Sequence, residues 1–154
     1  MKNTILLLTF ALFSITSTFA QKDKISIDKN IVTVNGVAVF ELDVTDNGNS
    51  IKLSNLDGKE LAFFKGLDFY DSQEITSGNP KGRVIYYETT FMNDQRQCEL
   101  SIPGMRKAFV KFILENKLVV DGEINVTAED RLILINGKKF SERKKNSTTI
   151  IIVR

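Results

Sequence analysis

The feature that most constrains the fold is a series of short segments in which apolar and polar residues alternate, separated by turn dipeptides. Asn35-Gly36 separates two such segments, and Asp57-Gly58 separates two more. Side chains of a strand point alternately to its two faces, so this period of two is typical of strands with one buried face. Asn-Gly and Asp-Gly tolerate the positive φ angles of tight hairpin turns. The first third of the chain is therefore predicted to be an antiparallel meander.

The same pattern predicts about eight strands in the whole chain. We expect them at Lys24–Asp28, Ile31–Val34, Val37–Val44, Ser50–Asn55, Glu60–Lys65, Arg83–Phe91, Gln97–Ile102 and Ser147–Arg154. Residues 66–82 form an unusually long connection for a compact domain, and its part around residues 67–71 is a further candidate strand.

The period changes to 3.6 after Pro103-Gly104. Apolar residues then follow the spacing of one helical face, which predicts an amphipathic helix that packs on the sheet. They are Met105, Ala108, Phe109, Phe112 and Ile113. The segment Thr127–Asn136 favours a second helix, although the uniformly apolar Leu132–Ile135 also fits a hairpin that turns at Asn136-Gly137. The expected fold class is α+β, a predominantly antiparallel sheet with hairpin and meander connections and one or two packing helices in the C-terminal half.

The N-terminus has the pattern of an export signal. Lys2 precedes the apolar run Ile5–Phe13, and small residues Thr18 and Ala20 stand at positions −3 and −1 of a cleavage site. The apolar run is too short for a membrane-spanning helix, and no later segment is long enough. We expect residues 1–20 to be a cleaved signal peptide and residues 21–154 to be a single β-rich domain. The mature protein is expected to be periplasmic or secreted, with no transmembrane segment.

Composition removes several classes of catalytic site. The chain has no histidine and one cysteine, which excludes imidazole-based triads, Cys/His zinc sites and an intramolecular disulfide. Cys98 lies on the apolar side of its alternating segment, where we expect a buried thiol; the alternative is a reactive or dimer-bridging thiol. No phosphate-binding or dinucleotide-binding motif is present, so we expect no cofactor and no metal. Carboxylates remain as the main acid–base groups, so a hydrolase that uses carboxylates alone is an alternative function.

The first candidate ligand-binding site lies in the long connection. It combines aromatic rings with negative charge at Asp68, Phe69, Tyr70 and Asp71. Irregular segments often carry function, and this one is expected to hold a cationic or carbohydrate partner. The alternative is that the rings fold back against the sheet.

The second candidate is a basic patch. Residues 21–100 contain 9 Lys and Arg against 13 Asp and Glu, whereas residues 101–154 contain 11 against 6. The patch is expected to comprise Arg106, Lys107, Lys111, Lys138, Lys139, Arg143, Lys144 and Lys145. Its expected partners are an envelope protein or an anionic glycan or lipid surface, not nucleic acid. A solvated helix face and loop would explain the same charges.

These observations favour a small exported protein that acts as a non-catalytic binding or interaction module of the cell envelope or extracellular space. Two alternatives remain open, a minimal carboxylate-only hydrolase and an envelope-associated accessory protein bound through its basic C-terminal half. No motif identifies a particular partner.

Overall fold

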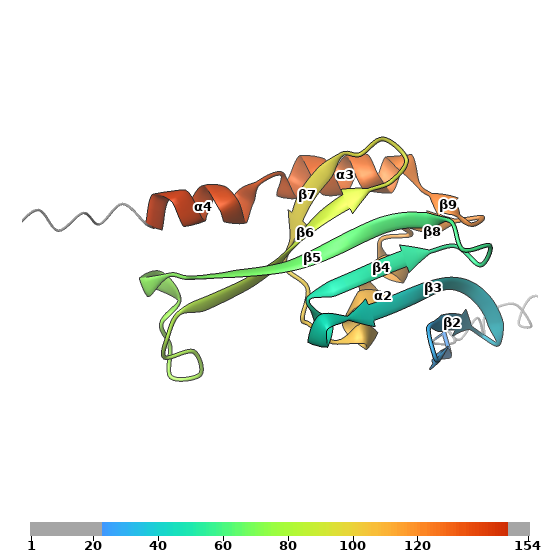
Figure 1. Cartoon of the computed structure of the whole chain (residues 1–154), viewed down its shortest axis with the longest axis horizontal. Helices are drawn as coiled ribbons and strands as arrows, with labels where there is room; N and C mark the ends of the chain where they lie inside the picture. The colour runs from blue at the N-terminus through green and yellow to red at the C-terminus, as the bar shows by residue number, and fades with distance from the viewer. Residues whose placement is uncertain (1–22, 148–154) are drawn as a thin grey trace, which may run out of the picture.

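The computed structural model describes residues 23–147, and its architecture is α+β, as expected (Figure 1). Seven antiparallel strands form one sheet in which the spatial order is the order along the chain. The strands of this sheet are β1 (Ile25–Asp28), β2 (Ile31–Val34), β3 (Val37–Thr45), β4 (Ser50–Ser54), β5 (Glu60–Tyr70), β6 (Arg83–Phe91) and β7 (Gln97–Leu100). The predicted meander is therefore confirmed and extends across the whole sheet.

The remaining elements are mostly helical. They are η1 (Asp46–Gly48), η2 (Ser72–Glu74), α2 (Arg106–Glu115), α3 (Val126–Asn136), α4 (Lys139–Ser147) and the two-stranded hairpin of β8 (Val119–Val120) and β9 (Glu123–Ile124). No helix among residues 23–147 has the length and apolar character needed to cross a membrane.

Local turn chemistry explains the first hairpins. Asn35 and Gly36 adopt φ angles of 54° and 85°, as the predicted tight turn between β2 and β3 requires. The following strands keep one buried face, so that Leu42 lies opposite Leu53 and both are fully buried. Cross-strand apolar pairs of this kind fix the register of the sheet.

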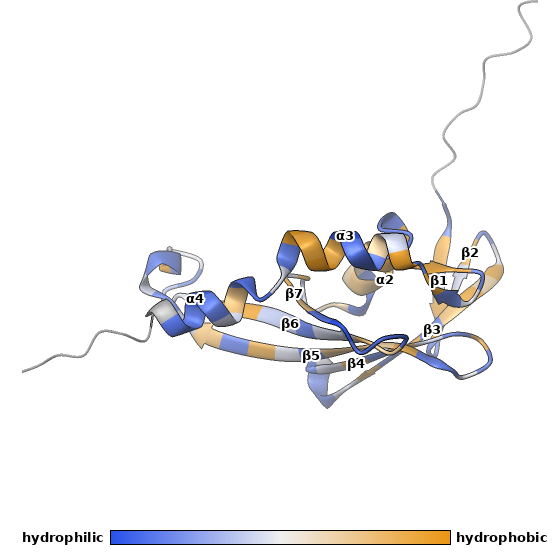
Figure 2. Ribbon diagram, turned by 90° about the horizontal axis from the view of Figure 1, so that it is seen from above, coloured by the Kyte–Doolittle hydropathy of each residue, from blue (hydrophilic) through white to orange (hydrophobic). Residues whose placement is uncertain are grey.

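The main core lies between one face of the sheet and the helices α2 and α3 (Figure 2). Phe109 of α2 is its centre, because its ring contacts Phe64 of β5 and Tyr87 of β6 edge to face, at centroid distances of 5.3 and 4.7 Å. Aromatic pairs in this arrangement stabilise a core beyond the area that they bury. The predicted amphipathic helix thus packs on the sheet as expected.

A second, smaller apolar cluster lies on the opposite face. Phe69 follows Phe64 by five residues in the unbroken strand β5, so the two rings point to opposite sides. Phe69 packs against Tyr86, and Tyr86 stacks on Phe140 of α4 at a centroid distance of 5.1 Å. The chain passes from α3 to α4 at the edge of β7, where the Gly137 carbonyl accepts a hydrogen bond of 2.9 Å from the Glu99 amide.

Several expected boundaries change. β5 continues to Tyr70, five residues beyond its expected end, so the connection to β6 shortens to residues 71–82. The segment Thr127–Asn136 is helical, and the hairpin alternative is wrong, because the Asn125 side chain caps α3 by accepting from the Ala128 amide. Helix α4 was not expected. Residues 1–20 of the expected signal and residues 148–154 of the expected last strand lie outside the described residues, and Ser147 ends α4.

Candidate functional site

The two aromatic side chains of the first candidate site point to opposite faces of β5. Phe69 is only 5% exposed, whereas the next residue, Tyr70, is 60% exposed on the other face. Asp68 forms an ion pair with Arg83 at 2.7 Å. Phe69 therefore folds back into the second cluster, and Tyr70 is the ring that remains on the surface.

Asp71 has a structural partner in α4. Its carboxylate accepts hydrogen bonds from the Gln73 amide at 2.9 Å and from Arg143 at 2.7 Å, and Arg143 also binds Glu74 at 2.7 Å. The Gln73 amide, and secondarily Arg143, hold the pKa of Asp71 below its ordinary value. This clamp fixes α4 to the connection between β5 and β6, so neither Asp71 nor Arg143 is available as a free charge.

The residues of the expected basic patch lie on separate helices, or beside them, and form two groups. Figure 1 shows α2 behind β3 and β4, and α4 beside the far end of β5 and β6. In the α4 group, Lys139 lies 5.9 Å from the centre of the Phe140 ring, while Lys138, Lys144 and Lys145 are exposed. The structure therefore does not join the α4 group and the α2 group into one surface.

The α2 group borders a groove. Arg106 itself is turned to the β1–β2 turn, where it donates to the carbonyl of Lys29 and to the side chain of Asn30. Lys107 and Lys111, one helical turn apart, instead lie beside β1. We call this depression the β1–α2 groove; it has a volume of about 480 Å³ and is lined by Ile25, Ser26, Ile27, Lys107, Val110 and Lys111.

The β1–α2 groove combines an apolar interior with a basic rim. Ile25 is 42% exposed although it belongs to the sheet, and Val110 forms the side of the groove on α2. Lys111 approaches Glu115 at 3.6 Å, but both side chains are more than half exposed, so that pair contributes little. A cavity of this size with apolar walls and a few charged groups is typical of a binding site.

A second hollow of about 530 Å³ has an acidic rim. It lies between the start of β3, the turn at Asp57 and the β8–β9 hairpin, where Asp121 and Glu123 line it. The Glu123 carboxylate is bound by Lys59 at 2.6 Å. Among residues 23–147 no group of three or more acidic or cysteine side chains is placed to hold a metal ion.

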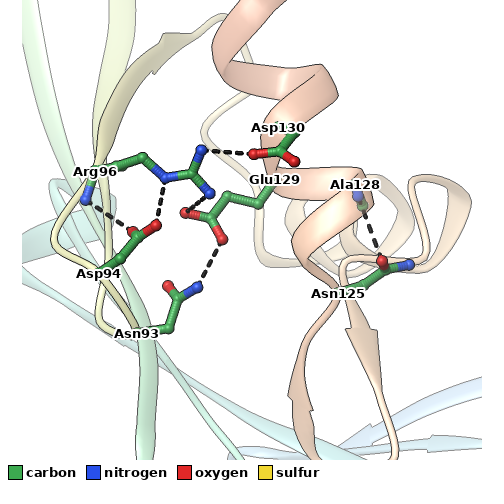
Figure 3. A network of polar contacts seen from close by, with 7 residues as sticks. All are labelled: Asn93, Asp94, Arg96, Asn125, Ala128, Glu129 and Asp130. Carbon is green, nitrogen blue, oxygen red and sulfur yellow. Dashed lines mark hydrogen bonds and ion pairs between the residues drawn. The ribbon is translucent and has the colours of Figure 1, made fainter.

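A carboxyl group with a raised pKa, that of the buried Glu129, lies in a polar network (Figure 3). Glu129 of α3 is fully buried; its carboxylate accepts from the Asn93 amide group at 2.7 Å and lies 3.1 Å from the Arg96 guanidinium. Burial, and to a smaller degree Asp94, raises the pKa of Glu129. Arg96 also pairs with Asp94 and, at 2.5 Å, with Asp130.

The chemistry of this network is structural. A raised pKa is a property of many catalytic acids, but such an acid must reach a substrate. Glu129 lines neither the β1–α2 groove nor the acidic hollow, nor two smaller or shallower hollows in the described part of the chain. The network instead joins the turn at residues 92–96 to the first turn of α3. The structure thus offers no carboxylate pair open to a substrate at this position.

Cys98 is buried, as expected. It is 1% exposed, and burial, reinforced by Glu129 and Glu99, raises the pKa of its thiol to about 12. A thiol that stays protonated at neutral pH is a poor nucleophile. The alternative of a reactive thiol therefore has no support in the geometry.

Sequence reasoning missed the apolar half of the groove. Ile25 and Ile27 alternate like residues of a strand face, and nothing local distinguishes them or Val110 from core residues. The spacing of Lys107 and Lys111 was the one local signal, since residues four apart lie on the same side of a helix. In comparisons with protein-family models, with curated proteins and with solved structures, no match to this chain was found.

Proposed function

We propose that this protein is an exported, non-catalytic binding protein of the cell envelope or extracellular space, and that the β1–α2 groove is its binding site. The observation that carries the proposal is the combination in one groove of the exposed Ile25, the half-buried Ile27 and two exposed lysines. Apolar walls supply affinity, and charged groups at the rim select the partner.

Export is the part of the proposal that rests on sequence. The pattern from Lys2 to Ala20 supports it, and a buried Cys98 is compatible with an oxidising compartment. Mass spectrometry of the protein recovered from its host should find Gln21 as the first residue. An unprocessed chain that starts at Met1 in the cytoplasm would contradict this part.

The groove itself is tested by charge reversal. The mature chain, residues 21–154, is used to capture partners from envelope and culture fractions, alongside a Lys107→Glu, Lys111→Glu variant. A matched control carries Lys138→Glu and Lys139→Glu, which change the same charge at the start of α4. All four side chains are exposed, so the variants should keep the wild-type melting temperature, which circular dichroism checks.

The proposal expects a partner that the wild type and the α4 control both capture and that the groove variant loses. Loss with the α4 control alone would instead favour an accessory protein bound through its basic C-terminal half. Equal capture by all three proteins, or capture by none, would also contradict the assignment of the groove.

A further inference from the structure

The β1–α2 groove has an unpaired strand edge on one side. β1 has β2 as its single strand neighbour among the described residues. The Asn35 amide donates to the Lys24 carbonyl at 2.9 Å, which makes Lys24 a hydrogen-bonded position of this antiparallel pair. Such positions alternate along a strand, so Ser26 also bonds to β2. The backbone N–H and C=O groups of Ile25 and Ile27 consequently point away from the sheet.

The other end of the sheet is protected in a way that β1 is not. At β7 the Glu99 amide already donates to the Gly137 carbonyl, and α3 packs along the strand. An unprotected edge is a template for pairing with another chain, and proteins usually cover it or break it with proline or charge. β1 contains no proline, its one charged residue, Asp28, is the last of the strand, and its two isoleucines line the groove.

The side chains at this edge face α2. Ile25 and Ile27 share one face of β1, while Ser26 turns to the other face, where its hydroxyl lies 2.7 Å from that of Thr33. A strand laid beside β1 would therefore present alternate side chains to α2, next to the exposed Ile25 and the half-buried Ile27.

The charges of α2 fit the spacing of that strand. Lys107 and Lys111 are separated by about 6 Å along the helix axis. Side chains on one face of a strand repeat at about 6.6 Å. A strand that runs along α2 would thus carry carboxylates at alternate positions with nearly the spacing of the two ammonium groups. Negative charge in the occupant is favoured for a second reason, because the weak contact with Glu115 is the one ion pair of either lysine in the described structure.

We propose that the partner is an extended, acidic segment of another protein, which adds to β1 as an extra strand and places carboxylates at alternate positions against Lys107 and Lys111. This inference rests on the proposed function of the groove and adds the chemistry and conformation of the partner. Main-chain hydrogen bonds to Ile25 and Ile27 add to the affinity that the apolar walls supply, and the lysines select the sequence.

The probe is a capped seven-residue peptide in which glutamate and valine alternate, with glutamate at both ends. Its matched control has glutamine in place of glutamate. Two further peptides carry backbone N-methyl groups, one on its internal glutamates and the other on its internal valines. Each removes the N–H donors of every second residue of the peptide and leaves the protein unchanged. Binding is followed by amide NMR shifts and hydrogen exchange on the uniformly labelled mature chain.

The glutamate peptide should slow hydrogen exchange of the Ile25 and Ile27 amides at least tenfold at saturation. Glutamine in the peptide, or Lys107→Gln with Lys111→Gln in the protein, should raise the Kd at least tenfold. Lys138→Gln with Lys139→Gln should leave the Kd unchanged. One of the two N-methylated peptides should lose binding, and the other should keep it. Which of them fails reveals whether the added strand is parallel or antiparallel to β1.

Equal binding of the glutamate and glutamine peptides, or equal effects of the two N-methylated peptides, would overturn the proposal. The proposal would also be overturned if another occupant filled the groove. Phosphatidylglycerol vesicles would then shift the groove amides when the peptide does not, or a second copy of the chain would protect Ile25 as the protein concentration rises. Residues 148–154 would be the occupant if the peptide bound only after their deletion. If the peptide does not bind but charge reversal at Lys107 and Lys111 still abolishes capture of the partner, the inference is wrong and the proposed function stands. If the peptide does not bind and charge reversal has no effect on capture, both are wrong.

Discussion

Removal of the Phe140 ring should release α4 without unfolding the sheet. Phe140 belongs to the second cluster, which lies on the opposite face of the sheet from the main core and contains only three buried residues. Its ring stacks on Tyr86 and is 9% exposed. Other contacts that hold α4 include the Glu99 carboxylate, which accepts from its first amides, and the clamp between Arg143 and Asp71. These contacts do not involve the main core.

The size of the effect follows from the burial of the ring. Replacement of a buried phenylalanine by alanine costs about 3–5 kcal/mol, and a small cluster at the sheet end warrants the lower value, about 3 kcal/mol. Since about 1.4 kcal/mol corresponds to a factor of ten, the equilibrium for opening α4 should increase about a hundredfold. Hydrogen exchange resolved by residue measures this directly, because local and global opening have separate free energies.

The control variant is Phe109→Ala, which removes the same ring from the main core. Phe109 is fully buried against Phe64 and Tyr87, so its loss should lower protection in every strand of the sheet. Phe140→Ala should instead lower the hydrogen-exchange protection of residues 139–145. The protection of β3 and β4 should stay within a factor of about three of the wild-type value. If Phe140→Ala lowers protection in β3 as much as in α4, the two faces unfold as one unit and the reasoning from separate clusters is refuted.

Three further predictions concern ionisable groups. Because the pKa of Asp71 is lowered from 3.8, its contribution to stability is present above that value and is lost as pH falls through the folded pKa; the Arg143 Nε–H signal should therefore persist to pH 4 and disappear only in stronger acid. Because the pKa of Glu129 is raised, its contribution to stability is lost as pH rises from 4.5 through the folded pKa. In urea titrations, the unfolding free energy of Glu129→Gln should therefore fall less between pH 5 and 8 than that of the wild type. An equal fall would contradict the burial of this carboxyl. Iodoacetamide at pH 8 should label Cys98 in the unfolded protein and leave the folded protein unlabelled, whereas rapid labelling of the folded chain would refute the shielded thiol.

The meander could be predicted because its signals are local. Asn35-Gly36 specifies its own turn, and alternation specifies the buried face of each strand. The end of β5 could not be predicted, because Gly66 has the appearance of a loop residue. In the structure Gly66 stays in the strand, where its amide donates to the Asn49 carbonyl at 2.6 Å and a Cβ would come within 3.2 Å of Asn49 and Tyr87. A close tertiary approach, not a turn, explains this glycine.

Helix α4 also depends on distant residues. Phe140 is the one apolar side chain in its nine residues, and its first turn is stabilised by Glu99, which lies 41 positions before Phe140. Neither periodicity nor a local cap could therefore indicate it. The groove was hidden for the same reason, because it joins Ile25 to Lys107 across about eighty residues of sequence. Sequence identified the charged residues, and the fold decided which of them share a surface.

The most direct test of a binding site at the β1 edge is hydrogen exchange at the amides of Ile25 and Ile27, with and without the glutamate–valine peptide. We predict fast exchange in the free protein, since both N–H groups point away from β2, and exchange at least tenfold slower with the peptide bound. Amides that are already protected in the free protein, or that respond no more than the hydrogen-bonded Ser26, would contradict a binding site at this edge.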